Sequence, residues 1–121
     1  MGRARIADDV GEASVGAALT AGASRDTTAT AVRYLLQLLS EQASGNTVEV
    51  RVPPFGAVQA IEGPRHTRGT PPNVIETDAV TWLALATGTE SWASAVAAGR
   101  VAASGSRADL SGYLPILRMR E

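Results

Sequence analysis

The spacing of apolar residues changes from a helical period to an extended one in the first half of this chain. Apolar residues at i, i+3, i+4 and i+7 indicate one buried stripe of an amphipathic helix: Val32, Leu35, Leu36 and Leu39. We expect Asp26 or Thr27 to cap the start of this helix and Gly45 to end it. Residues 48–52 read Val-Glu-Val-Arg-Val, and this alternation predicts a strand with one buried and one charged face. The two patterns together require a helix packed on a sheet.

Proline and glycine divide the chain after that strand. Pro53 and Pro54 end it, because proline cannot continue a central ladder, and Gly56 turns the chain. Residues 57–62 then predict a second strand, which pairs with the first as an antiparallel hairpin. After a loop rich in glycine and proline, residues 73–77 predict a short third strand.

The last third of the chain carries helix signals at short intervals. Residues 79–87 predict an apolar helix that Asp78 caps and Gly88 ends. A second short helix runs through Trp92 and Val96 before Gly99.

A last strand and a last helix complete the expected elements. Residues 100–104 predict the strand, and Ser106 with Asp109 has the spacing of a capping box. The helix that follows would carry residues 110–114, with Pro115 ending or bending it.

This order of elements predicts an α+β domain with helices on one face of a mostly antiparallel sheet. We assign the domain to residues 26–121. Residues 1–25 are small and polar, and we expect a weakly ordered leader or a short helix there.

Composition excludes several classes of protein. The 121 residues include no cysteine and a single histidine, which argues against a disulfide scaffold, a thiol nucleophile and a metal site. Eleven basic residues balance twelve acidic ones, so the charge excess of a nucleic-acid binder is absent. No apolar stretch is long enough to span a membrane, and we expect a cytoplasmic protein. All eleven basic residues are arginine, which suggests a GC-rich genome such as that of an actinobacterium.

One polar segment is a candidate site for an anion or a protein partner. Its cationic and hydroxyl side chains are Arg65, His66, Thr67, Arg68 and Thr70. A solvated loop is the more common role of such a segment. His66 has the chemistry of a general base, but no Gly-x-Ser-x-Gly elbow accompanies it. We therefore expect no enzymatic activity, no cofactor and no metal.

Trp82 and Trp92 stand out in a chain with 4% aromatic residues. Core packing explains at least one of them. The functional alternative is that they line an apolar cavity between the helices and the sheet.

The ordered set of elements from Asn73 onward resembles the sterol carrier protein type 2 family. The features that carry this resemblance are Glu76-Thr77-Asp78, the run from Trp82 to Gly88, Trp92 with Val96 and Gly99, the run from Arg100 to Gly105, and Leu110, Tyr113 and Leu114. The resemblance extends over about residues 27–117. The runs 53–59 and 63–73 are similar to a small actinobacterial branch, the sterol carrier family proteins.

The resemblance implies a five-stranded sheet with a hydrophobic tunnel beneath its helices. Such a tunnel accepts fatty acyl chains, acyl-CoA or sterols without catalytic groups. Carried over by position, its lining is Leu35, Leu39, Val58, Ile61, Trp82, Leu83, Trp92, Val96, Leu110 and Leu114.

An accessory role is the alternative function. The C-terminal domain of mycothiol-dependent maleylpyruvate isomerases also resembles this fold, and their metal-binding histidines lie in a separate helical bundle. In that role the protein would be a non-catalytic partner, docking through residues 65–70.

Overall fold

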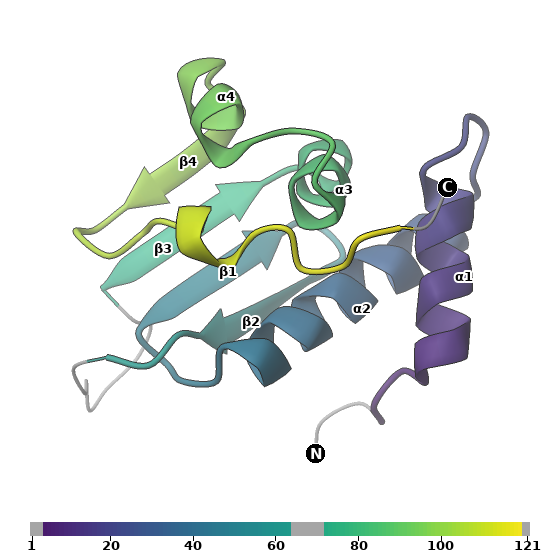
Figure 1. Cartoon of the computed structure of the whole chain (residues 1–121), viewed down its shortest axis with the longest axis horizontal. Coiled ribbons are helices and arrows are strands. Elements are labelled where there is room, and N and C mark those ends of the chain that lie inside the picture. The colour runs from purple at the N-terminus through teal and green to yellow at the C-terminus, as the bar shows by residue number, and fades with distance from the viewer. Residues whose placement is uncertain (1–3, 64–71, 120–121) are drawn as a thin grey trace.

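The computed structural model describes residues 4–63 and 72–119, which form helices packed on a mixed sheet (Figure 1). The elements in chain order are α1 (Asp8–Ala18), α2 (Arg25–Gln42), β1 (Val48–Val52), β2 (Gly56–Ala60), β3 (Asn73–Thr77), α3 (Ala79–Thr87), α4 (Trp92–Ala97), β4 (Val101–Ser104) and the 3₁₀ turn η1 (Ser111–Tyr113). The α+β class expected from the sequence is confirmed.

The described sheet has four strands in the order β2-β1-β3-β4. Val50 pairs with Val58 of β2 in an antiparallel ladder and with Ile75 of β3 in a parallel one. Ile75 pairs in turn with Ala103 of β4 in an antiparallel ladder. Helices α2 and α3 lie across one face of this sheet (Figure 1). Val48, Val50 and Val52 of β1 point to that face and are fully buried.

The expected count of five strands is wrong for the described residues. After β4 the chain leaves the sheet, forms η1 and continues across the helices toward α1 (Figure 1). The backbone N–H groups of Ile116 and Leu117 both donate to the carbonyl oxygen of Ala86, at 2.8 and 3.0 Å. These bonds hold the C-terminal segment on helix α3, so it does not pair with a sheet edge.

The expected last helix is also wrong, since residues 111–113 form only a 3₁₀ turn. The Asp109 carboxylate accepts a hydrogen bond from the Ser111 N–H at 2.7 Å, so a local turn replaces the expected capping box. Pro115 excludes helical geometry from the residue before it, and Leu114 is extended at φ −108° and ψ 145°.

The helix boundaries follow their capping side chains. Ser24, rather than Asp26 or Thr27, caps α2: its hydroxyl accepts a hydrogen bond from the Thr27 N–H. The boundaries expected for α3 are confirmed, because the Asp78 carboxylate accepts from the Thr81 N–H at 2.7 Å. Gly88 ends this helix in the left-handed region, at φ 85°.

Strand β2 is shorter than the expected 57–62 and begins at Gly56. It ends where Ile61 adopts a φ of 73°, which no strand continues. The Ile61 N–H donates to the Ala43 carbonyl, and its carbonyl accepts from the Thr47 N–H. The chain therefore leaves the sheet after β2, next to the end of α2.

Helix α1 forms within the segment expected to hold a leader or a short helix, and it packs against α2 (Figure 1). A Cβ at Gly11 would overlap the ring of Tyr34, so glycine is what allows the two helices to approach closely. The Tyr34 hydroxyl donates to the Asp8 carboxylate at 2.8 Å.

Candidate functional site

The structure brings most of the predicted tunnel residues into one hydrophobic core. The members that are buried in this core are Leu35, Leu39, Ile61, Trp82, Leu83 and Leu110. Val58, Trp92 and Leu114 are partly buried and pack against it. Val96 lies apart from the core, with 42% of its surface exposed.

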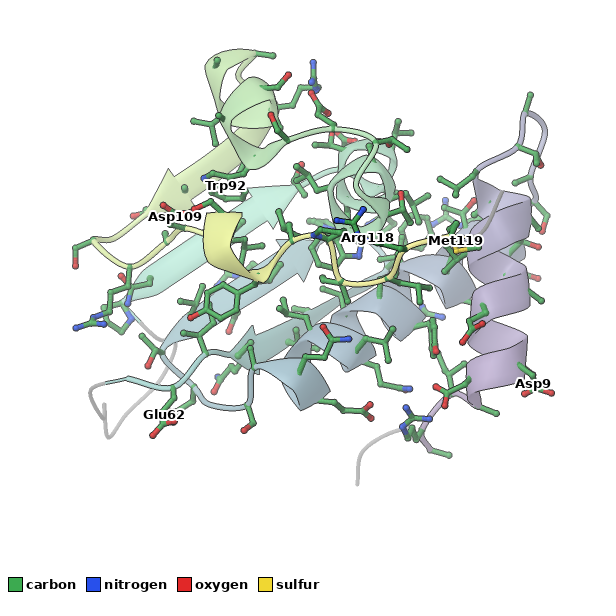
Figure 2. All side chains as sticks on the ribbon, viewed as in Figure 1. Asp9, Glu62, Trp92, Asp109, Arg118 and Met119 are labelled. Atoms are coloured by element: carbon green, nitrogen blue, oxygen red, sulfur yellow. The ribbon has the colours of Figure 1, made fainter. Side chains whose placement is uncertain are left out.

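The two tryptophans occupy different environments. Trp82 is completely buried between helix α3 and helix α2, where its indole Nε1–H donates to the Val32 carbonyl at 3.3 Å. Trp92 begins α4 and lies toward the strands (Figure 2), and its side chain is partly buried. Trp82 therefore packs in the hydrophobic core.

A pocket of about 750 Å³ lies on another side of α2, next to the free edge of β2. Three segments supply its lining: Ala4, Arg5, Ile6, Ala7 and Val10 from the N-terminal segment, Thr30, Arg33, Leu36, Gln37 and Ser40 from α2, and Phe55, Gly56, Ala57 and Val58 from the β1–β2 hairpin. We call this the leader pocket. Val58 is the one predicted lining residue that it contains.

Most of the leader pocket surface is apolar. Its larger apolar side chains are Ile6, Val10, Leu36, Phe55 and Val58. A volume of this size lies within the range of about 300–1,000 Å³ found for small-molecule sites.

Hydrogen bonds attach the N-terminal wall of the pocket to α2. The Gln37 side chain accepts from the Ile6 N–H at 2.8 Å and donates to the Ile6 carbonyl at 2.9 Å. Arg5 donates to both carboxylate oxygens of Glu41, at 2.6 and 2.8 Å, and to Asp8 at 3.1 Å. The wall is thus held by paired contacts with one face of α2.

These contacts shift the pKa values of the groups involved. The Tyr34 hydroxyl and then the Arg5 guanidinium, each hydrogen-bonded to Asp8, lower the pKa of that carboxyl. Arg5 likewise lowers the pKa of Glu41. Burial and the hydrogen bond to Asp8 raise the pKa of Tyr34 to about 12. Asp8 and Glu41 therefore hold the wall as charged carboxylates, and Tyr34 holds it as a neutral phenol.

Two arginines hold the hairpin side of the pocket. The Arg33 Nε–H donates to the Phe55 carbonyl at 2.7 Å, and the Arg25 guanidinium lies 5.3 Å from the centre of the Phe55 ring. Cation–π contacts of this kind attach the hairpin turn to the first turns of α2.

The candidate loop of residues 65–70, with His66, lies outside the described residues. Within the residues that are described, no group of three or more histidine, cysteine or acidic side chains is placed to hold a metal ion. None of the described helices is long and apolar enough to cross a membrane.

Sequence reasoning missed both the N-terminal wall and the role of Arg33. Ile6 lies in a short stretch with Ala4 and Ala7 between charged residues, so no helical or strand periodicity marks it. Arg33 interrupts the apolar run of α2 between Val32 and Leu35, and this interruption is the feature of the sequence that could have marked Arg33 as a pocket residue.

Comparison with known proteins places the chain in a family. A family model described as "Bacterial SCP ortholog" matches residues 24–116, from the N-cap of α2 to the segment held on α3. No curated protein matches the chain. The match leaves outside the family region the residues that form one wall of the leader pocket: Ala4, Arg5, Ile6, Ala7 and Val10. Since the match spans most of the sequence and agrees with the resemblance to sterol carrier protein type 2, the chain belongs to the bacterial SCP ortholog family.

Proposed function

We propose that this protein binds a hydrophobic small molecule in the leader pocket and does not act on it chemically. The observation that carries this proposal is an apolar pocket of about 750 Å³ between helix and sheet in a chain of the SCP family. Each buried methylene of a ligand contributes about 0.8 kcal/mol, so an apolar pocket of this size binds a lipid chain without a catalytic group. Fatty acyl chains, acyl-CoA and sterols are the classes to test.

The site residues predicted from the family resemblance remain a second proposed lining. Val58 belongs to both sets, so a contact at Val58 does not distinguish them. Variants that fill one region and leave the other intact do distinguish them.

A matched pair of threonines in α2 provides that test. Thr30 lines the leader pocket and Thr28 does not, and both are half-buried. We expect wild-type protein and Thr28→Trp to bind a fatty acid or an environment-sensitive lipid probe saturably, and Thr30→Trp to lose at least about tenfold in affinity because the indole occupies the pocket. The measurement is a fluorescence or calorimetric titration, with circular dichroism as the control for folding. If no member of an acyl and sterol panel binds the wild-type protein saturably, the proposed function is wrong.

A further inference from the structure

The charged groups of the leader pocket are unbalanced. Among its lining residues Arg5 and Arg33 are cationic, and none is acidic. The charge of Arg5 is matched outside the lining, because its guanidinium is paired with Glu41 and Asp8. Arg33 has no ion pair within residues 4–63 and 72–119, so its charge is the one that the pocket leaves unmatched.

The hydrogen bonding of Arg33 leaves part of its guanidinium available. Its Nε–H is used by the Phe55 carbonyl, which fixes the orientation of the planar group. Its two terminal nitrogens have no hydrogen-bond partner in the part of the chain that is described. Since the side chain is half-buried, a bound anion would satisfy these donors in a partly desolvated place.

Apolar surface continues directly from this guanidinium. Leu36 lies one turn further along α2, and Gly56 of the hairpin lies next to both residues. A Cβ at Gly56 would lie 3.4 Å from Leu36 Cδ1 and 3.6 Å from Arg33 Cγ, which are ordinary contact distances, so the start of β2 borders the arginine stem. Ile6, Val10 and Val58 extend the apolar wall. The pocket therefore has a cationic group beside a continuous apolar surface. A molecule with one anionic head group and one apolar chain matches both features.

We propose that Arg33 binds the anionic head group of the ligand, so that the leader pocket selects a single-chain amphiphile with a carboxylate-type head over a neutral lipid. This proposal rests on the function proposed above. The terminal nitrogens of Arg33 bind the two oxygens of the head group, and the chain lies along Leu36 and the hairpin. Arg25, beside Phe55, adds a second positive charge near the same wall.

The first test compares two ligands that differ only in the head group. Dodecanoate and dodecanol are titrated into the wild-type protein by calorimetry, below the critical micelle concentration of the acid. We expect dodecanoate to bind at least about tenfold more tightly, which is the scale of a charge-assisted pair of hydrogen bonds. Equal affinities would overturn the role of Arg33 and leave the proposed function standing. Absence of binding by both would overturn both proposals.

The second test assigns the preference to Arg33. In Arg33→Gln we expect the preference to disappear, so that dodecanoate and dodecanol bind with equal affinity. Arg33→Lys keeps the charge but not the planar fork, and we expect it to retain part of the preference. The matched control is Arg107→Gln, which removes an exposed arginine next to β4, the opposite edge of the sheet from β2. Equal weakening of both ligands in Arg33→Gln would mean that Arg33 only holds the hairpin, and would overturn the proposal.

Discussion

Two apolar regions of this molecule border the same helix and differ in what occupies them. Between α2, α3 and the sheet, large side chains such as Trp82, Leu35 and Leu39 are buried against one another in the core. On the other side, between α2, the edge strand β2 and the N-terminal segment, a pocket of about 750 Å³ is present. The family resemblance predicts a ligand site in the first region, and we propose one in the second, where the pocket is present. The comparison shows that one helix borders both a filled apolar core and a pocket, so the apolar pattern of α2 alone does not distinguish two candidate sites.

The largest effect should come from the core region. We expect Trp82→Ala to lower the free energy of unfolding by about 3–5 kcal/mol, because it removes a completely buried indole and leaves a cavity. Chemical denaturation measures this loss, and Trp82→Phe gives a milder variant that stays folded. A loss below about 1 kcal/mol would mean that Trp82 does not pack the core, and would return it to the set of candidate ligand contacts.

A smaller effect should come from the contact between α1 and α2. We expect Gly11→Ala to destabilise the protein by about 1–3 kcal/mol, because its methyl group overlaps the Tyr34 ring. Gly16→Ala is the matched control in the same helix, since its Cβ would lie 3.6 Å from Met119 Cε, an ordinary contact. Met119 lies beside α1 in Figure 2.

The same pair of glycines also tests the pocket. Displacing α1 removes Val10 and its neighbours from the pocket wall, so we expect weaker lipid binding in Gly11→Ala and none of this loss in Gly16→Ala. Thermal unfolding and lipid titration of both variants provide the measurements. Unchanged binding in a destabilised Gly11→Ala would show that the pocket does not depend on α1.

The capping of α3 should give an effect of about 1 kcal/mol. We expect Asp78→Ala to lose the hydrogen bond to the Thr81 N–H and to be destabilised by about that amount, with lipid binding unchanged. Asp78→Asn is the control that keeps a capping oxygen. A change in lipid affinity in Asp78→Ala, measured alongside the free energy of unfolding, would connect the α3 region to the ligand site.

The smallest effect should be the pH dependence of the N-terminal wall. Because the folded pKa values of Asp8 and Glu41 are lowered, their contribution is present above the ordinary values of 3.8 and 4.5 and is lost as pH falls through the folded values. The pKa of Tyr34 is raised from 10.0 to about 12, so its contribution is present below pH 10 and is lost as pH rises through 12. Hydrogen exchange of α1 amides against pH measures both. Arg5→Gln should reduce the acid sensitivity, and an unchanged profile in that variant would contradict the assignment.

Local patterns in the sequence predicted the elements that local chemistry decides. The alternating valines of β1, the Asp78 cap and the Gly88 stop all lie where expected, because each signal acts within a few residues. The prediction of a last helix was wrong because distant contacts decide the structure there. Pro115 and the bonds from Ile116 and Leu117 to Ala86 override the capping pattern of residues 106–109. The count of five strands came from the family resemblance, and the described sheet has four.

The candidate site was the least predictable part. The pocket is formed by segments far apart in the chain, and contacts such as Ile6 with Gln37 have no sequence signature. Arg33 is visible only as a charge within an apolar run, and such a charge more often lies on a solvated helix face. Its bond to the Phe55 carbonyl, which gives it a fixed position in the pocket, depends on the tertiary fold.

The most direct test of the account maps the bound chain onto the two regions. Nuclear Overhauser effects are measured between ¹³C-labelled dodecanoate and the methyl groups of the protein. We predict contacts from the ligand to Ile6, Val10 and Leu36, which line the leader pocket, and none to Leu83 or Leu110 in the core. Contacts to Leu83 and Leu110, with none to Ile6 or Val10, would place the ligand between α3 and the sheet and contradict the account.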